Sequence, residues 1–329
     1  MDAAETDWEP MQVWFITTGQ AGFRTQARGL ASALSDSPRE LVVGLRAPLS
    51  LLPGALAAPM ALAAQAPDAD RLAPPWPDVL VSCGRRTTAL SIAVRRASRG
   101  ATFTVHVQNP LTDLAAFDLV APMAHDHVSG PNVLTVRTAL HDVTPARLAE
   151  AAEAWRDRLT EPGRPLIGVL LGGSSRAAPF EAAEASALAA QLAELKRQTG
   201  ARLAITPSRR TPLEARAALE AAFAGDPDAL VWDMAGDNPY RGILALSDRL
   251  IVSGDSVSMI SEALSTPNPV EVIGLGGGRR HGEFLRGLIA DGLARPFAGD
   301  PQPGPAHAPL DATATVAQAV RDALQRRMG

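Results

Sequence analysis

Short apolar runs alternate with longer amphipathic segments along most of the chain. In the first half this pattern predicts strands at residues 13–16, 41–45, 78–82, 102–107, 118–121 and 133–136. It also predicts a helix at 25–34 and a second helix that follows residues 83–88 and ends at residue 96. Strands that alternate with helices are typical of repeated βα units. We therefore expect a mainly parallel sheet in this half.

A second βα series follows a helix expected at 145–159 and a Pro/Gly-rich segment at 160–165. Its expected strands are 166–171, 202–206, 230–232, 249–252 and 270–273, with helices at 181–198, 212–223 and 312–327. A chain of 329 residues favours two domains of about 150 residues each. The pattern predicts an α/β protein of two Rossmann-like domains, at 11–160 and 165–311, with parallel sheets facing a cleft.

The composition limits the functional classes and the cellular compartment that we expect for this protein. The 31 basic and 35 acidic residues give a net charge of −4, which does not indicate a nucleic-acid binder. The single cysteine, Cys83, excludes an internal disulfide framework and fits a reducing compartment. The acidic N-terminus at residues 1–7 is unlike a targeting peptide, so we expect a cytoplasmic protein.

The segment at residues 47–67 is apolar, uncharged and long enough to suggest a membrane span. It contains Pro48, Pro53, Pro59 and Pro67, which no unbroken helix in lipid could accommodate. We expect a loop with one short apolar helix. A peripheral contact of this segment with a membrane or an oily acceptor is a second hypothesis.

A run of hydroxyl residues follows the expected strand at 249–252. Ser253, Ser256 and Ser258 stand at a strand-to-helix junction, where hydroxyls and backbone N–H groups can hold a phosphate. Glu262 lies about one and a half turns into the helix, within reach of a sugar hydroxyl. The alternative is an ordinary, well-capped helix.

Other strand ends of the second half carry residues suited to a diphosphate. These residues are Gly172, Gly173 and Ser174 after the first strand, Ser208, Arg209 and Arg210 after the second, and Asp255 beside the serines. Guanidinium groups can hold phosphate oxygens in a bidentate manner. Together they predict a nucleotide-diphosphate site.

Strand ends of the first half carry a second group of polar and glycine residues. The group comprises Gly19, Gly22, Gln26, Arg85, Arg86, Thr87 and Gln108, which we expect to line the acceptor side of the cleft. Two arginines at a helix N-terminus oppose the helix dipole and favour a bound anion between them. Ordinary turns and a solvated face remain the alternative.

His125 and Asp126 are candidates for acid–base catalysis. Transfer to a hydroxyl needs a base near the acceptor oxygen, and either side chain could supply it. Asp126 could equally cap its loop. Although His127 follows, the cluster lacks a metal-ligand pattern, and we expect no metal.

The chain resembles the bacterial relatives of the plant Elongated Mitochondria fission protein, some of which are labelled nucleoside-diphosphate-sugar epimerases. The resemblance rests on Gly19, Gly22 and Gln26, Gly84–Thr87, Gln108–Pro110, Phe117–Val120 with His125 and Asp126, Gly172–Ser174, Ser208–Pro212, Asn238–Tyr240, and Asp255–Ala263. That family is similar to glycosyltransferases of the B fold. The resemblance implies a donor nucleotide on the C-terminal half, ribose contact by Glu262, and a C-terminal helix at 312–329 that packs back on the first domain.

The leading hypothesis is a glycosyltransferase-like enzyme that moves sugar from a nucleotide-diphosphate sugar to an unknown acceptor, with a cell-envelope acceptor as one version. A nucleotide sugar is then the expected small-molecule partner, and no other cofactor is expected. A non-hydrolysing nucleotide-sugar epimerase and a non-catalytic scaffold or recruiter are the alternatives. Likeness of fold alone does not choose among them.

Overall fold

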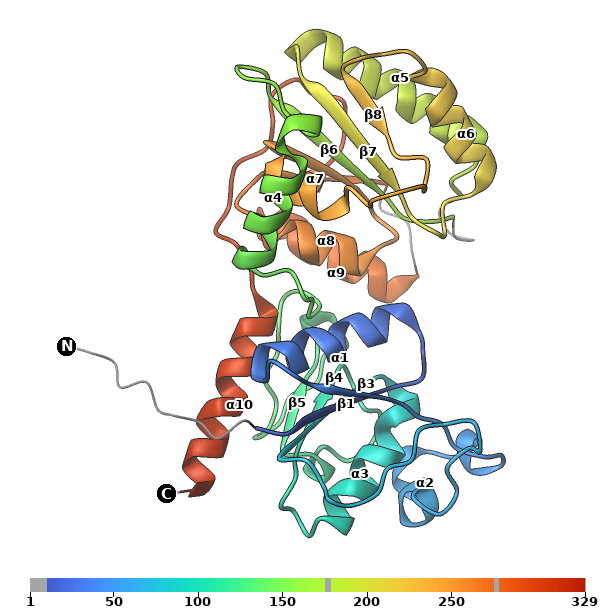
Figure 1. The fold of residues 1–329 in the computed structure, drawn as a ribbon, viewed down its shortest axis with the longest axis vertical. Helices are drawn as coiled ribbons and strands as arrows, with labels where there is room; N and C mark the ends of the chain where they lie inside the picture. The colour runs from blue at the N-terminus through green and yellow to red at the C-terminus, as the bar shows by residue number, and fades with distance from the viewer. Residues whose placement is uncertain (1–10, 175–178, 275–277, 329) are drawn as a thin grey trace, which may run out of the picture. The chain divides into compact units, whose positions relative to one another are not determined.

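The computed structural model describes residues 11–174, 179–274 and 278–328, so the acidic residues 1–7 lie outside the described part. The chain forms two compact units (Figure 1). The first comprises Met1–Asp142 with Asp311–Gly329, and the second comprises Val143–Leu310.

The first unit is built on a parallel sheet with the order β2-β1-β3-β4-β5. Its strands are β1 (Val13–Thr17), β2 (Arg39–Val42), β3 (Val79–Cys83), β4 (Phe103–Val107) and β5 (Leu119–Ala121). All residues of β1, β3 and β4 are buried, because helices cover both faces of the sheet.

Helices α2 (Gly54–Ala61) and α3 (Thr88–Ala97) cover one face of this sheet, where Ala57 and Leu90 share a core with Ile16 of β1. Helices α1 (Ala21–Leu34) and α10 (Ala312–Met328) pack side by side on the other face (Figure 1). Short 3-10 turns lie at Leu49–Leu51 (η1), Arg85–Thr87 (η2), Leu114–Ala116 (η3) and Ala124–Asp126 (η4).

The second unit has a parallel sheet with the order β11-β10-β9-β6-β7-β8. Its strands are β6 (Leu166–Leu171), β7 (Arg202–Pro207), β8 (Ala229–Val231), β9 (Arg249–Ser253), β10 (Val270–Ile273) and β11 (Arg295–Pro296). Its helices are α4 (Pro145–Leu159), α5 (Ala182–Thr199), α6 (Leu213–Ala222), α7 (Tyr240–Leu246), α8 (Val257–Ala263) and α9 (Arg279–Ala290).

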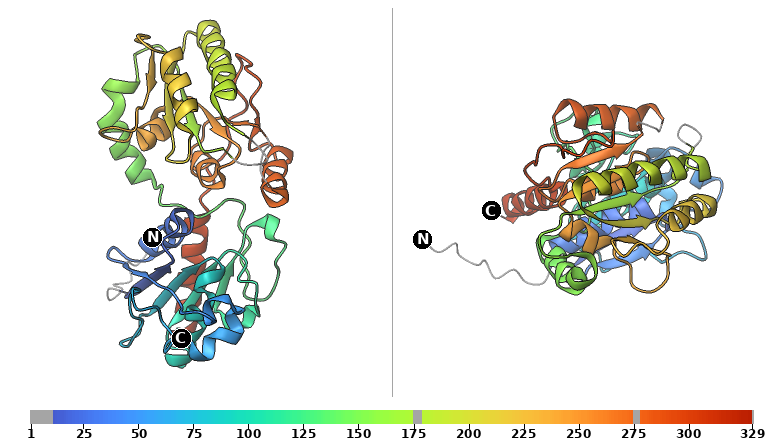
Figure 2. Two further views of the ribbon diagram at one scale, coloured as in Figure 1. Left: turned by 90° about the vertical axis from the view of Figure 1, so that its right-hand side faces the viewer. Right: turned by 90° about the horizontal axis from the view of Figure 1, so that it is seen from above.

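Alternate side chains of β6 belong to two different hydrophobic cores. Val169 packs with Leu192 of α5 on one face of the sheet, and Leu170 packs with Trp155 of α4 and Ile243 of α7 on the other. Side chains point to opposite faces along a strand, so the fully apolar run of β6 packs against helices on both faces of the sheet (Figure 2).

Most expected strands are present, with ends that differ by no more than three residues from those expected. The strand expected at 133–136 is wrong: Val133 and Val136 form only isolated bridges, to Val120 and Met123. Pro122 follows the short strand β5 and has no N–H, so the pairing does not continue as a ladder.

The two units divide at Asp142 and Val143, whereas the expected domain at 11–160 ended after the helix at 145–159. This helix, α4, belongs to the second unit because Trp155 and Leu159 are buried in its core. Residues 311–329 belong to the first unit. There the hydroxyl of Thr313 donates to the carbonyl of His141 at 2.8 Å.

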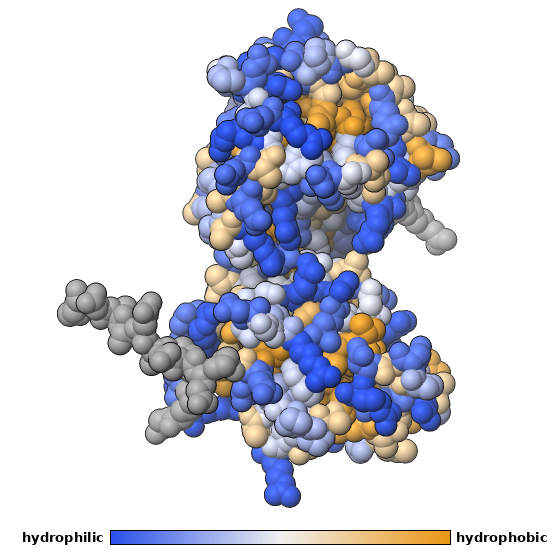
Figure 3. Space-filling view, in the orientation of Figure 1, coloured by the Kyte–Doolittle hydropathy of each residue, from blue (hydrophilic) through white to orange (hydrophobic). Residues whose placement is uncertain are grey.

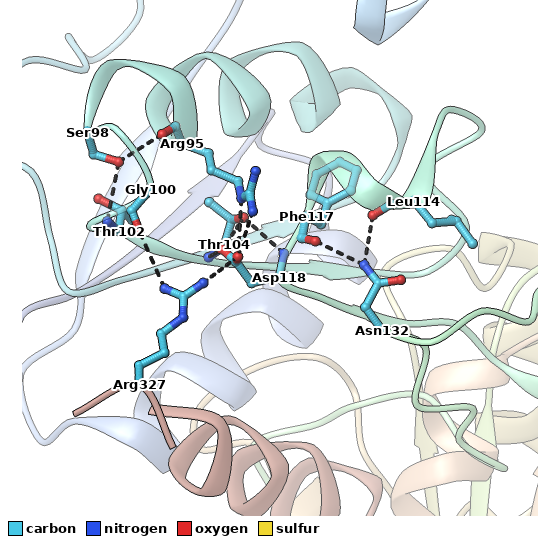
Figure 4. A network of polar contacts seen from close by, with 10 residues as sticks. All are labelled: Arg95, Ser98, Gly100, Thr102, Thr104, Leu114, Phe117, Asp118, Asn132 and Arg327. Carbon is cyan, nitrogen blue, oxygen red and sulfur yellow. Dashed lines mark hydrogen bonds and ion pairs between the residues drawn. The ribbon is translucent and has the colours of Figure 1, made fainter. Parts of the chain in front are cut away.

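Asp118 joins α3, β4 and α10 in a polar network (Figure 4). Its carboxylate accepts from Arg95 at 3.0 Å, from the N–H of Thr104 at 2.8 Å, and from Arg327 of α10. Burial alone would raise the pKa of Asp118, but the bonds from Arg95 and Thr104 and the charge of Arg327 outweigh it and lower the pKa. The C-terminal helix is thus tied to the first sheet by charge as well as by packing.

Candidate functional site

Three neighbouring strands of the second unit end at one edge of the sheet. Because β6 lies between β9 and β7, the residues that follow β6 contact both neighbours. The N–H of Gly172 donates to the hydroxyl of Ser253 at 2.6 Å, and the hydroxyl of Ser208 donates to the carbonyl of Gly172 at 2.9 Å. The structure therefore brings these predicted residues together, as expected for the carboxyl ends of parallel strands.

Asp255 is the centre of this edge. Its carboxylate accepts from the hydroxyl of Ser253 and from the N–H of Gly173, each at 2.9 Å, and pairs with Arg210 at 3.0 Å. The side chain of Asp255 is only 8% exposed. We expected these groups to bind phosphate directly, but here they bond to one another and hold the loops in place.

Two glycines are required by this close approach. A Cβ on Gly172 would lie 2.2 Å from Oδ1 of Asp255, and one on Gly173 would lie 2.6 Å from Cβ of Arg210. Any larger side chain would separate the two loops. Ser174 is exposed, and its hydroxyl accepts from the N–H of Phe180 at 3.0 Å.

Helix α8 begins beside this network. The hydroxyl of Ser256 caps the helix by accepting from the N–H of Met259 at 3.4 Å, so the capping alternative holds for this serine. Ser258 is half-buried in the first turn. Arg209 is exposed and has no hydrogen bond or ion pair with the described residues, unlike its neighbour Arg210.

Glu262 lies further along α8 and is 9% exposed. The phenol of Tyr240, at the start of α7, donates a hydrogen bond to Oε2 of its carboxylate. Sequence reasoning included Tyr240 in a motif without giving it a role. Its position after Asn238 and Pro239, as the one tyrosine of the chain, was the available signal.

In the first unit, several residues expected to line a cleft are engaged in turns. The hydroxyl of Thr87 is buried against the carbonyls of Cys83 at 3.1 Å and Gly84 at 2.9 Å. The amide of Gln26 is also buried and donates to the carbonyl of Gly22 at 3.3 Å. These side chains stabilise the turns that carry them.

Gly19 and Gln108 both have positive φ angles, of 81° and 77°. The N–H of Gly19 donates to the hydroxyl of Thr17 at 3.1 Å, and that of Gln108 donates to the carbonyl of Ala121 at 2.9 Å. Both residues form sharp turns at strand ends. For Gln108 the left-handed backbone is unusual and fixes the chain after β4.

Arg85 and Arg86 line a cavity of about 410 Å³ within the first unit. The cavity lies at the carboxyl ends of β1 and β2, and its wall includes Thr18, Gly44 and Leu49–Leu52. Both arginines are exposed, and neither forms a hydrogen bond or ion pair with the described residues. Gly84, with a φ of 77°, makes the turn that presents them.

His125 and Asp126 lie in the 3-10 turn η4 and are half-buried. The carboxylate of Asp126 accepts from the N–H of Met123 at 3.2 Å, which is the capping role that we had considered as the alternative. Within the described ranges, no group of three or more His, Cys, Asp and Glu side chains could hold a metal ion.

Two α/β units, each with a parallel sheet and polar residues at its strand ends, define the glycosyltransferase B class of fold. A family model for "Mitochondrial fission ELM1" matches residues 21–324, and the chain belongs to this family.

The chain is 30% identical over 277 residues to the mitochondrial fission protein ELM1 of Arabidopsis thaliana. The match covers 76% of this chain and 65% of that protein, so this chain spans less than two thirds of its relative. Among solved structures, UDP-GlcNAc 2-epimerase of Methanocaldococcus jannaschii matches with a TM-score of 0.50 and 11% identity, over 75% of this chain and 77% of that chain. MurG of Acinetobacter baumannii matches with a TM-score of 0.49 and 14% identity, over 96% and 93%.

Proposed function

We propose that the second unit binds a nucleotide-diphosphate sugar and that the protein is a glycosyltransferase-like enzyme. The observation that carries this proposal is the carboxylate of Glu262, which is nearly buried and is oriented by the phenol of Tyr240. A fixed, desolvated carboxylate is a strong acceptor for a ribose hydroxyl. The fold is consistent with this role because a similar structure is that of a UDP-GlcNAc epimerase.

The diphosphate would be held by groups that the Asp255 network leaves available. Arg209 is exposed and lacks an ion-pair partner in the described part, and Ser258 lies in the first turn of α8. The first N–H groups of a helix have no partner within it and attract an anion. In this proposal Gly172, Ser208 and Asp255 set the shape of the loops, and Arg209 neutralises the phosphate charge.

For the transfer step, the bond from the sugar to the diphosphate breaks, a bond to an acceptor hydroxyl forms, and a base takes the hydroxyl proton. His125 and Asp126 remain our candidates for that base. Because Asp126 also caps η4, its replacement should perturb the turn as well. The Asp126→Asn variant should therefore be compared with His125→Ala for turnover and for donor binding separately.

The proposal can be tested by binding measurements with UDP, GDP, ADP and their sugars. A ligand at about 100 times its Kd stabilises the folded state by about 2.7 kcal/mol, which a thermal-unfolding screen detects. For the nucleotide that binds, Glu262→Gln should weaken binding by about 1–3 kcal/mol. The matched control is Glu220→Gln, an exposed glutamate on α6. If no nucleoside diphosphate or nucleotide sugar binds, the proposal is wrong.

Two alternatives have a specific basis and make different predictions. The epimerase alternative is favoured by the similar M. jannaschii structure, and it requires interconversion of sugars without an acceptor. The recruiter alternative is favoured by family membership, and it requires neither release of nucleotide diphosphate nor interconversion. A transferase releases nucleotide diphosphate only when an acceptor is present.

A further inference from the structure

Helix α2 exposes apolar side chains where a surface helix normally carries polar ones. Leu56 and Met60, four residues apart on one face of the helix, are 68% and 60% exposed. Just before it, Leu51 and Leu52 are 76% and 44% exposed. These four residues are more than half of the seven strongly exposed large hydrophobic side chains in the described part, and they fall within ten residues of sequence.

In Figure 3, apolar surface reaches the exterior on the side of the first unit where Figure 1 places α2. The opposite face of α2 is buried through Ala57, Ala58 and Ala61. The helix is therefore anchored on one face and apolar on the other, and no residue from 47 to 67 carries a charge. Exposing an apolar face to water costs free energy, so this face of α2 favours contact with an apolar partner.

The exposed leucines lie next to two cations, Arg85 and Arg86, that form no ion pair with the described residues. Leu51 and Leu52 share the wall of the 410 Å³ cavity with Arg85 and Arg86. The start of α2 is seated tightly on α3, since a Cβ on Gly54 would lie 2.5 Å from Cγ2 of Thr88. Neighbouring guanidinium groups repel each other and oppose the dipole of the helix that they precede, and a bound anion relieves both effects.

We propose that this cavity and α2 form a docking site for a phosphate lipid in a bilayer. The phosphate headgroup lies between Arg85 and Arg86, and Leu51, Leu56 and Met60 enter the acyl-chain boundary. Apolar side chains beside basic residues are the pattern of interfacial membrane contact. A protein partner fits less well, because protein interfaces are rich in aromatic residues and 47–67 contains none. The inference uses the first unit alone and does not depend on nucleotide binding.

The test is co-sedimentation of the full chain with vesicles. We expect binding to vesicles of phosphatidylcholine mixed with phosphatidic acid, and much weaker binding to phosphatidylcholine alone. A basic residue near an anionic surface contributes about fivefold to binding, so Arg85→Ala/Arg86→Ala should weaken it about thirtyfold. Leu51→Ser/Leu56→Ser should weaken it by about tenfold or more.

Matched variants separate this site from general effects. Arg96→Ala/Arg326→Ala removes the same charge from exposed positions of the first unit, and Leu213→Ser removes a leucine that is 66% exposed on α6. Both should bind as the wild type does. Arg85→Lys/Arg86→Lys keeps the charge and should retain most of the binding, which shows that loss in the alanine variant is not misfolding.

Three results would overturn the proposal. One is an absence of vesicle binding by the wild-type chain. Another is equal loss of binding in the Arg96→Ala/Arg326→Ala control, which would indicate nonspecific charge attraction. The third is complete displacement by inorganic phosphate at the same phosphate concentration as the lipid, which would indicate a site for a soluble phosphate compound.

Discussion

Oδ2 of Asp255 accepts a hydrogen bond from the backbone N–H of Gly173 at 2.9 Å, although the two residues are 82 positions apart in the chain. This bond joins the loop after β6 to the loop after β9. Arg210, from the loop after β7, pairs with the same carboxylate oxygen. One nearly buried carboxylate therefore fixes three loops at the edge where the nucleotide site is proposed.

Replacing Asp255 should destabilise the second unit. In Asp255→Ala, the N–H of Gly173 and the hydroxyl of Ser253 lose their acceptor, and unsatisfied groups of this kind cost about 1–3 kcal/mol. Urea unfolding measures the loss. Asp237→Ala, at an exposed aspartate of the same unit, should change the free energy of unfolding by less than about 0.5 kcal/mol. Equal stability of the two variants would contradict a structural role for Asp255.

The loop contact also makes a prediction for Gly172. A methyl group there would lie 2.2 Å from Oδ1 of Asp255, so Gly172→Ala should destabilise the protein by about 1–3 kcal/mol. Gly22→Ala is the matched change, because no atom lies within 4 Å of the added Cβ and the residue is in helix α1. It should be neutral or stabilising by up to about 1 kcal/mol. A tolerated Gly172→Ala would mean that the Asp255 loop can move away freely.

The lowered pKa of Asp118 predicts acid sensitivity of the first unit. The unfolded carboxyl titrates near pH ~3.9, and the folded one titrates lower. The ionised Asp118 thus contributes stability above pH ~3.9, and this contribution is lost as the pH falls through the folded pKa.

Asp118→Asn should cost about 3 kcal/mol near neutral pH, because Arg95 and Arg327 lose a carboxylate that is only 6% exposed. The difference from wild type should shrink below pH ~3.9. Urea unfolding at a series of pH values checks this, with the exposed Asp68→Asn as the control. A difference that does not depend on pH would show that the charge of Asp118 is unimportant.

The buried His106 predicts that the free energy of unfolding also changes in a second, separate pH range. Burial lowers the pKa of its imidazole to about 3, while its Nδ1 lies 2.9 Å from the hydroxyl of Ser82. Below pH ~6.5 the unfolded chain binds a proton that the folded one does not. Stability should therefore fall by about 1.4 kcal/mol per pH unit from this group as the pH decreases below that value.

NMR titration of the imidazole checks this directly. The ring of His106 should stay neutral at pH ~5 in the folded protein and titrate near ~6.5 in urea. His106→Gln should remove this component of the acid slope above pH ~5, where the carboxylate of Asp118 does not titrate. Protonation of the folded ring near pH ~6.5 would be incompatible with the burial seen here.

Local sequence patterns were sufficient to predict most of the strands and helices of the fold. The apolar runs of β1 and β6 identify buried strands, because both faces of each sheet are covered and an unbroken apolar run indicates burial on both sides. The same signal failed at 133–136, where the apolar run exists but Pro122 limits the partner strand. Pairing depends on the neighbour as well as on the segment itself.

The candidate site was only partly predictable. The sequence identified Gly172, Ser253 and Asp255 as residues at strand ends, because they follow apolar runs that predict buried strands. It did not show that their donors and acceptors satisfy one another, nor that Tyr240 orients Glu262. Nor did it place Arg85 and Arg86 beside the exposed leucines.

The sequence by itself determined the βα alternation, the family and which residue types stand at the strand ends, because these follow from local periodicity and motifs. The tertiary structure decided that α4 belongs to the second unit and that Asp255 joins three loops. The physical reason is strand order: β6 lies between β9 and β7, so residues up to 82 positions apart become hydrogen-bond partners. No local pattern encodes which strands are neighbours.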